Sequence, residues 1–482
     1  MLTLDEIANQ AMLDRGFLTD YPQLVLNEVD SIKDPGAKCF TPTPKDMRDR
    51  QWFSIDNDDS LDLDQLTYAE KTSSGKEKIY VAIADVSGLV QKDSPTDQYA
   101  SHNTTSVYTP TKIFHMLPPK LSTDLTSLNE NVERCAIVVE MDIGSDGSFE
   151  LSDIYPAAVL NHAKLAYNRV AAWMQKKVPQ PHATVDIPWL PEQLKLQDAL
   201  AQRIKDYRNR QGNLSFSTIE MQPIMTNGIP TGVQETIHNR ANTLIENFMI
   251  AANVGVTRYL EKKGIPIIKR IVETPKRWDR IVELAKDLGH KLPSEPNGKA
   301  LRDFLLQQRR SDPVHFPDLS LAVIKLIGRG EYIVAIPNQP SPGHFDLALQ
   351  DYAHTTAPNR RYPDLIMQRL LNNLFNHTNS PYTTEDLNAI AQHCTEKEND
   401  AAKVQRRVNK SAAAMVLEPR IGTQYPAIVT GKTPKGTWVR LKTMPVEGKL
   451  IQGFQNVDVG DLLTVKLMYV DVQNGFIDFA KV

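Results

Sequence analysis

A run of acidic residues near the front of the chain most constrains how the chain can fold. Residues 51–70 hold five Asp and one Glu but no Lys or Arg. Carboxylates this crowded repel one another unless a metal cation or cationic side chains lie among them. The fold must therefore bring a positive group to this run, and segment 54–66 is a candidate functional site.

Within this run, apolar and acidic residues alternate from Leu61 to Asp64. In an extended segment, this period of two predicts that the two Leu face the core and that Asp62 and Asp64 project together on the other side. Oxygen ligands on one face suit Mg²⁺. A solvated turn is the alternative. An EF-hand calcium loop is excluded, because Leu61 and Thr67 stand where Gly and Glu are required.

Length and composition limit the class of protein. The chain has 482 residues, of which 41% are hydrophobic and 23% are charged, so we expect a globular protein of two or three domains. Its 3 Cys are too few for a disulfide framework or a four-Cys zinc site. Neither a signal peptide nor an apolar run of membrane-spanning length is apparent in the sequence. We therefore expect a cytoplasmic protein that does not associate with membranes.

Positive charge gathers toward the C-terminus, although the net charge of the chain is −3. Residues 401–450 contain ten Lys and Arg against only Glu418 and Glu447. An acidic cluster and a basic region in one molecule suit a polyanionic substrate that is drawn to the basic region and held at the acidic one through metal. A solvated basic surface is the simpler alternative.

Hydrophobic patterning predicts an α+β fold. Residues 1–50 form a short, mainly helical N-terminal segment, with helices expected at 4–12 and 21–29 before a Pro-rich connector. Strands are expected at 78–86, 134–143, 265–272 and 331–336. Residues 242–260 read as a long helix that is apolar on nearly all sides, which is typical of a central helix.

Residues 421–482 change character and predict a small barrel. Five short strands are expected, at residues 427–430, 437–441, 448–452, 462–472 and 475–479, with Gly-containing turns between some of them. This number of strands in so short a segment fits an OB-type barrel. Trp438, Tyr469 and Phe476 would offer stacking faces among basic side chains, as single-stranded nucleic acids require.

A second candidate site lies in residues 343–364. Pro363 suits the first turn of a helix, so Arg360 and Arg361 are expected just before the positive end of that helix. Two guanidinium groups beside free backbone N–H groups make a strong anion site. Arginines held in structural ion pairs are the alternative.

Taken together, these segments resemble the RNase II/RNase R (RNB) family of processive 3′-to-5′ exoribonucleases. The resemblance covers residues 50–482 in family order and rests on the acidic run and on motifs at residues 83–87, 105–108, 116–128, 245–253 and 344–365. It implies an RNB catalytic domain at 51–420 and a C-terminal OB-fold RNA-binding domain at 421–482. It also implies a monomer that hydrolyses single-stranded RNA with a free 3′ end to nucleoside 5′-monophosphates, with Mg²⁺, or Mn²⁺ as a substitute.

The resemblance also assigns the metal and phosphate sites. Asp56, Asp62 and Asp64 match the metal-site or catalytic aspartates of the family. Among these, we expect hydrolysis to depend most on the carboxylate of Asp64. Arg360 matches the arginine that steadies the phosphate under attack.

Three further residues are assigned to RNA binding in the same way, and Arg361 joins them from the anion site. Tyr108 and Phe216 match the aromatic residues that clamp the terminal bases. Glu246 matches a residue that contacts a ribose and helps to distinguish RNA from DNA. From pattern alone, Glu246 is equally consistent with a first-turn residue that complements a helix dipole.

The sequence departs from the family pattern in several places, including Asp346 where a Gly is common and Gln405 where a Glu is often found. Gln65 stands where a fourth aspartate is usual, and Asp58 or Asp59 are candidates to replace it. Residues 1–50 have no room for the two cold-shock barrels that usually precede the RNB domain, so we expect a short form that lacks them. Because Gln65 weakens the metal shell, a catalytically silent RNA-binding protein on the same scaffold is the competing interpretation.

Overall fold

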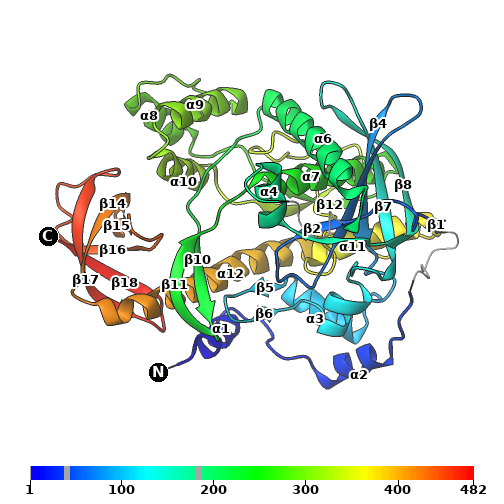
Figure 1. The fold of residues 1–482 in the computed structure, drawn as a ribbon, viewed down its shortest axis with the longest axis horizontal. Coiled ribbons are helices and arrows are strands. Elements are labelled where there is room, and N and C mark those ends of the chain that lie inside the picture. Colours follow the sequence, from blue (N-terminus) through cyan, green and yellow to red (C-terminus); the bar gives the residue numbers. More distant parts are fainter. Residues whose placement is uncertain (1, 37–43, 180–185) are drawn as a thin grey trace.

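The computed structural model describes residues 2–36, 44–179 and 186–482, which form a mixed α+β molecule with a closed barrel at its C-terminal end (Figure 1). Of the predicted N-terminal segment, residues 1 and 37–43 lie outside the described residues. The segment holds helices α1 (Leu4–Leu13) and α2 (Gln23–Ser31), close to the predicted ranges. Helix α1 begins with a capping box, in which Thr3 and Glu6 each accept a hydrogen bond from the backbone N–H of the other.

The largest sheet has five strands in the order β1-β8-β7-β4-β3. The strands are β1 (Lys45–Asp46), β8 (Phe149–Leu160), β7 (Glu133–Ile143), β4 (Glu77–Ala84) and β3 (Gln65–Lys71). All neighbours run antiparallel except β1, which pairs parallel with β8. Strands β4 and β7 confirm the predicted strands at 78–86 and 134–143.

Helix α7 (Arg240–Lys262) confirms the predicted central helix and packs on one face of this sheet against β4, β7 and β8. The helix lies close to the sheet at Gly255, where an added Cβ atom would come within 2.8 Å of the Met141 sulfur. Helix α6 (Leu190–Gln211) lies beside α7, and its Gln193 side chain bonds both the N–H and the carbonyl of Ala69 on β3. These contacts hold β3, the edge strand into which the acidic run leads.

The other elements of this part surround the sheet and α7. Helix α12 spans 34 residues and runs from beside α11 to the barrel (Figure 1). The helices are α3 (Pro95–Asn103), α4 (Tyr167–Met174), α11 (Tyr362–Phe375) and α12 (Thr384–Leu417). The strands are β2 (Ser54–Asp56), β5 (Val107–Tyr108), β6 (Ile113–Phe114), β9 (Lys164–Ala166), β10 (Met221–Thr226), β11 (Ile229–Glu235), β12 (Ile267–Ile271) and β13 (Glu331–Ala335). Two short turns of helix complete the set, η1 (Lys120–Leu125) and η2 (Glu418–Arg420).

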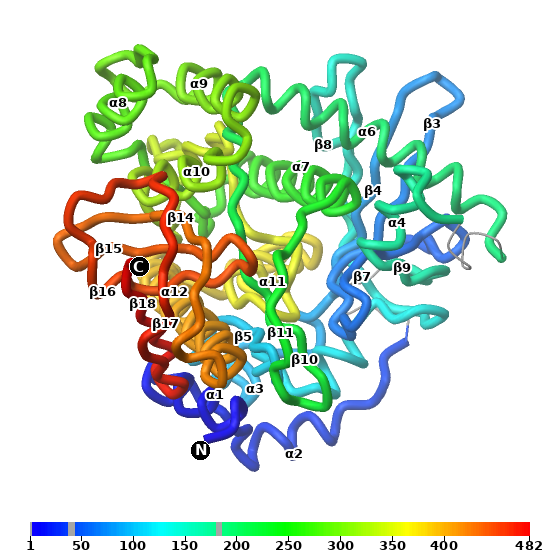
Figure 2. The backbone as a smooth tube through the Cα atoms, turned by 60° about the vertical axis from the view of Figure 1, so that its left-hand side comes forward, coloured from blue at the N-terminus to red at the C-terminus, as the bar shows by residue number. Residues whose placement is uncertain are grey.

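Three helices form a small unit with its own apolar core, which we call the α8–α10 unit. They are α8 (Trp278–Asp287), α9 (Gly298–Ser311) and α10 (Phe316–Ile327). Trp278, Phe304 and Phe316 are buried in this core, and the partly buried Phe216 packs against it. Figures 1 and 2 both show the unit next to the barrel and away from the large sheet.

The barrel closes in the order β14-β15-β16-β18-β17, which confirms the five predicted strands. They are β14 (Gln424–Thr433), β15 (Gly436–Leu441), β16 (Glu447–Gln452), β17 (Leu462–Asp471) and β18 (Phe476–Lys481). Along β15, buried and partly exposed residues alternate, so one face fills the barrel interior. Ala413, Ala414 and Leu417 at the end of α12 join the same core and fasten the barrel to the rest of the molecule.

Among the helices of the described residues, none combines the length and the hydrophobicity that crossing a bilayer requires.

Candidate active site

The acidic run is held by backbone contacts on both sides. Strand β2, which ends at Asp56, pairs in parallel with β9. Further on, the Ser127 hydroxyl donates to the carbonyl of Leu61 at 2.8 Å and accepts from the N–H of Leu63 at 2.9 Å. The Asp64 carbonyl then accepts from the N–H of Ala84 at the end of β4. The run is therefore a fixed loop between two strands.

The prediction that Leu61 and Leu63 both face the core is wrong. Leu63 is 1% exposed, whereas Leu61 is 63% exposed. Residues 61–64 precede β3 and belong to no strand, so the period of two does not apply to them. Asp64 is buried, and Asp62 is only partly covered.

Arg360 reaches this loop from a segment almost 300 residues away in the sequence. The Ser106 N–H donates to the Arg360 carbonyl at 3.0 Å, and the Tyr362 N–H donates to the Thr104 carbonyl at 2.8 Å. Helix α11 then starts at Tyr362 with Pro363 in its first turn, as the sequence predicts. This pairing places Arg360 and Tyr108 next to the acidic loop.

The two candidate sites meet at Asp64. The Arg360 Nε donates to Asp64 Oδ2 at 2.9 Å across a separation of 296 residues, and the Asn359 N–H donates to Asp64 Oδ1 at 3.3 Å. Arg360, at the point where α11 begins, is thus one of the positive groups that the acidic run requires.

Burial and like charge perturb two of the three aspartates. Burial raises the pKa of Asp64 to about 7 against the opposing charge of Arg360, and the charge of Asp62 raises it further. Burial also raises the pKa of Asp56 to about 6, although Ser54 and Lys164 oppose this shift. Perturbed carboxyl groups of this kind make the loop a candidate functional site.

Only part of this arrangement fits a metal. The buried Asp56 Oδ2 has no hydrogen-bond partner among the described residues, and a cation would satisfy it. Hard carboxylate oxygens suit Mg²⁺. However, the Asp64 oxygens are engaged by Arg360 and Asn359, and no three Asp, Glu, His or Cys side chains of the described residues converge as a metal site. The donor chemistry therefore fits a divalent cation at Asp56 and Asp62, whereas Asp64 would have to exchange Arg360 for it.

Tyr108 lies beside the aspartates. Its hydroxyl donates to Asp62 Oδ2 at 2.6 Å, and its ring is partly exposed. Burial of the hydroxyl raises the Tyr108 pKa despite the charge of Arg360, and Asp62 raises it further, so the group stays protonated.

Phe216 and Glu246 lie on other elements. Phe216 follows α6 and packs against the α8–α10 unit. Glu246 is exposed in the second turn of α7, so it is not the first-turn residue that the alternative required. Burial tends to raise the Glu246 pKa, but the hydrogen bond from His238 and the charge of Arg208 lower it below the usual value. Glu246 is therefore ionised at neutral pH.

Arg361 is engaged within its own helix. Its Nε and Nη2 donate to Asp364 at 2.9 and 2.7 Å, a two-point ion pair in the first turn of α11. The structural ion pair that was the alternative for both arginines thus describes Arg361. Arg360 remains the arginine that faces the acidic loop.

Tyr167 and Lys164 are neighbours of the site that the motif analysis does not include. The backbone pairing of β2 with β9 sets Asp56 beside Ala166, directly before Tyr167. Burial and the nearby Asp56 raise the Tyr167 pKa, and Lys164 Nζ donates to the Ser60 carbonyl. In the sequence, these residues stand only in a short Lys-Leu-Ala-Tyr run. That run does not indicate that the segment pairs in parallel with β2.

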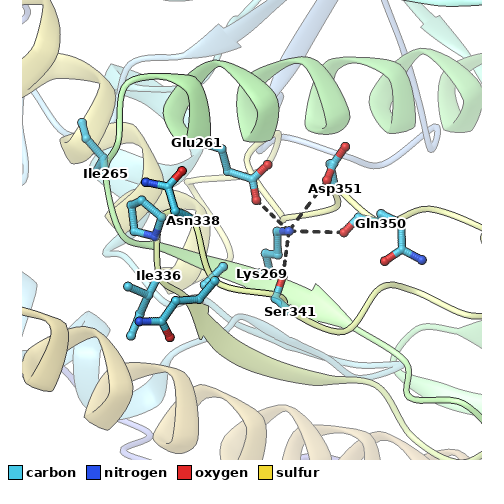
Figure 3. Close-up of a pocket in the computed structure, with 11 residues that line it drawn as sticks. Glu261, Ile265, Lys269, Ile336, Asn338, Ser341, Gln350 and Asp351 are labelled. Atoms are coloured by element: carbon cyan, nitrogen blue, oxygen red, sulfur yellow. Dashed lines mark hydrogen bonds and ion pairs between the residues drawn. The ribbon is translucent and has the colours of Figure 1, made fainter.

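A separate polar cavity of about 350 Å³ lies between the end of α7 and β13 (Figure 3). Its central Lys269 is buried, and Lys269 Nζ lies 2.6 Å from Glu261 and 3.8 Å from Asp351. Ser341 and the Gln350 carbonyl accept hydrogen bonds from the same nitrogen. Because this lysine is already fully partnered, the cavity is a structural ion network and holds none of the predicted site residues.

Comparison with known proteins places this geometry in a family. Residues 44–377 match the RNB domain model, and residues 423–482 match the model of the RNase II-type exonuclease C-terminal S1 domain. Ribonuclease R of Aquifex aeolicus is 31% identical over 440 residues, which are 89% of this chain but 61% of that protein. The chain therefore spans only about three fifths of that relative's length.

Solved structures share the fold. Mycoplasma genitalium RNase R in complex with ribose methylated single-stranded RNA superposes with a TM-score of 0.88 at 22% identity, covering 99% of this chain and 78% of the other. Yeast Ssd1, described as a pseudonuclease, superposes with a TM-score of 0.70 at 15% identity, covering 92% of this chain and 55% of the other. On the extent of the domain match, this chain belongs to the RNB-domain family, with an RNase II-type S1 domain at its C-terminal end.

Proposed function

We propose that this protein is a 3′-to-5′ exoribonuclease that hydrolyses single-stranded RNA from a free 3′ end to nucleoside 5′-monophosphates. The observation that carries the proposal is the contact between Asp64 and Arg360, which joins the acidic loop to a cationic group at a helix N-terminus. Hydrolysis of an anionic phosphodiester requires both the acidic loop and the cationic group. The RNB and S1 matches and the similarity to Ribonuclease R support the same activity.

In the proposed reaction, water attacks the terminal phosphorus and the bond from phosphorus to the 3′ oxygen breaks. The released nucleotide keeps the phosphate on its 5′ oxygen, and the shortened RNA gains a 3′ hydroxyl. Arg360 is placed to neutralise charge on the phosphate oxygens, where stabilisation counts most as negative charge accumulates. Asp64, which Arg360 contacts, is placed at the same phosphate and orients the Arg360 guanidinium group.

We propose that Asp56, Asp62 and Asp64 hold Mg²⁺, for which Mn²⁺ is a substitute. The unpartnered buried oxygen of Asp56 supports this assignment. When bound, such a cation orients water and offsets phosphate charge. Gln65 begins β3 beside this group and would offer a neutral oxygen at most.

The proposed RNA contacts come from several elements of the molecule. Tyr108 and Phe216 would stack on terminal bases. The ionised Glu246 is suited to accept a hydrogen bond from a ribose hydroxyl. On the barrel, Tyr469 and Phe476 are exposed and suited to stacking. Arg361 would add positive charge behind Arg360.

A catalytically silent RNA-binding protein is the second candidate, and Gln65 is the observation that favours it. Yeast Ssd1 carries the same fold and is described as a pseudonuclease, so the fold alone does not decide. Retention of Asp56, Asp62, Asp64 and Arg360 favours the enzyme.

One experiment separates the two candidates. Purified protein is incubated with 3′-extended poly(A), first with Mg²⁺ and then with a chelator, and the products are resolved by chromatography and on a gel. Mononucleotides that appear only with Mg²⁺ support the exoribonuclease. A gel shift without products supports the silent binder, and internal fragments would indicate an endonuclease and contradict the proposal.

A further inference from the structure

A buried ion pair holds the barrel to the α8–α10 unit. Arg440 on β15 donates its Nη1 to Asp318 Oδ1 at 2.7 Å and its Nη2 to Asp318 Oδ2 at 3.2 Å. The side chains of Arg440 and Asp318 are only 15% and 5% exposed. Two-point pairs of this kind fix relative orientation, and leaving one partner buried alone is costly. The pair therefore sets the position of the barrel against α10.

The same helix fastens the segment that carries Phe216. Ser320 lies two residues after Asp318 and is fully buried, and its hydroxyl accepts a hydrogen bond from the Ser217 N–H at 3.2 Å. On the other side, the Leu214 N–H donates to the Asp346 carbonyl at 2.8 Å. The segment is thus held between α10 and the loop that leads to Arg360.

The Phe216 ring depends on this unit as well. It packs against the apolar core of α8, α9 and α10, whereas Asp56 ends β2, which pairs with β9, and Asp64 directly precedes β3 of the large sheet. Close-packed interiors move as whole elements and do not deform smoothly. A shift of α10 would therefore carry Phe216 relative to the aspartates.

We propose that Arg440, Asp318 and Ser320 are positioning residues that couple the docking of the barrel to the placement of Phe216 over the terminal base. This inference rests on the proposed function, because that function assigns Phe216 to the RNA. A docked barrel holds α10 in place, and α10 holds the Phe216 segment through Ser320. An undocked barrel frees α10, so the terminal base loses part of its stacking partner.

A direct contact of Arg440 with RNA is the main competing explanation. Both Nη atoms of Arg440 donate to Asp318, and the side chain is mostly covered, which argues against it. RNA length separates the two explanations. An oligoadenylate too short to reach from the acidic loop to the barrel responds to the coupling but not to a lost contact on the barrel.

The test measures stacking without cleavage. Full-length protein is titrated, with chelator present, with a short and a long oligoadenylate that carry 2-aminopurine at the 3′ terminus, and quenching of its fluorescence reports stacking. Arg440→Gln and Asp318→Asn should each weaken binding of the short RNA about three- to tenfold and reduce the quenching at saturation. The Arg440→Gln/Asp318→Asn pair, which leaves no lone buried charge, should recover part of the loss.

A double-mutant cycle tests the chain of contacts itself. Ser320→Ala removes the acceptor of the Ser217 N–H without altering charge, and should also reduce quenching with the short RNA. Combined with Arg440→Gln, it should add little, because both act through α10. If the double variant instead showed the full product of the two single effects, the coupling between the barrel and Phe216 would be contradicted. Arg280→Gln, at the exposed pair with Glu283 on α8, is the matched control and should change nothing.

The remaining outcomes are also decisive. Loss of affinity for the long RNA alone would overturn the coupling and make Arg440 a direct RNA contact. A lower unfolding temperature with unchanged quenching in all variants would show that the pair is only structural, and would overturn it too. Wild-type protein that binds and quenches but yields no nucleotide after Mg²⁺ is added would refute the exoribonuclease while leaving the coupling measurable.

Discussion

The acidic loop and the C-terminal barrel are built in opposite ways. The site around Asp64 is assembled from segments at residues 54–64, 104–108, 164–167 and 359–361, and it buries polar atoms, of which Asp56 Oδ2 has no partner among the described residues. The barrel uses one continuous segment, its interior is apolar, and it leaves Tyr469 and Phe476 53% and 59% exposed. Buried carboxyl groups cost stability, whereas exposed rings cost little.

The contrast separates the region suited to catalysis from the region suited to binding RNA. Charges forced together in a buried place have their proton affinities shifted and are suited to act on a phosphate. Rings displayed on a stable barrel are suited to hold a flexible strand without regard to sequence. The ion pair between Arg440 and Asp318 joins the barrel to the α8–α10 unit, against which Phe216 packs.

The sharpest test of this contrast is Asp64→Asn. We expect hydrolysis to fall at least ~10³-fold while RNA affinity stays within a few-fold, because the substitution removes a charged group from the reacting site but leaves the barrel intact. Nucleotide release and filter binding measure the two quantities. Asp49→Asn, at an exposed carboxylate, is the control. Near-normal hydrolysis by Asp64→Asn would contradict the assignment.

Arg360→Lys should have the next largest effect. Lysine keeps the charge but loses the planar fork, so we expect the turnover rate to fall about 100-fold with little change in affinity. The same substitution at Arg361, which is committed to Asp364, should chiefly lower the unfolding temperature. If both variants lose turnover equally, the distinction between the two arginines is wrong.

Asp56 should make stability depend on pH in the metal-free protein. Its folded pKa is raised from 3.8 to about 6, so the folded state holds a proton that the unfolded state has already released. Stability from this group is therefore present below pH 4 and is lost as the pH rises through 6, by about 3 kcal/mol in total. Urea unfolding with chelator at pH 4, 5, 6 and 7 should show a smaller loss in Asp56→Asn than in wild type, because Asp64, whose pKa is also raised, still contributes to the loss in the variant.

Parallel pH profiles for wild type and Asp56→Asn would show that Asp56 is not the group responsible. Added Mg²⁺ should restore the wild-type stability near pH 7 if the cation binds there.

The barrel rings should give the smallest effects. Tyr469→Ala and Phe476→Ala should each weaken binding of long RNA about tenfold and leave turnover at saturation unchanged, because each removes one stacking surface remote from the aspartates. Leu462→Ala, at another exposed apolar residue of β17, is the control. A fall in turnover at saturating RNA would contradict the separation of RNA binding by the barrel from catalysis at the aspartates.

Local patterns predicted most elements of the fold. Helix α7 and strands β4 and β7 were expected close to their observed bounds, because each is a run of mainly apolar residues that is buried as one regular element. The period of two failed at Leu61, where Ser127 holds the backbone of a loop. Tyr167 went unseen because its nearness to Asp56 comes from a parallel strand pair more than a hundred residues apart in the sequence.

Sequence patterns were enough to predict the barrel, the main helices and the family, since each depends on short-range spacing or on motifs that stand in order along the chain. The contacts of the folded chain were needed to show which arginine meets Asp64, that Arg361 bonds Asp364, and that the segment of Phe216 is bonded to α10 through Ser217. These are contacts between distant segments, and their energies depend on burial and on partners that no local pattern contains.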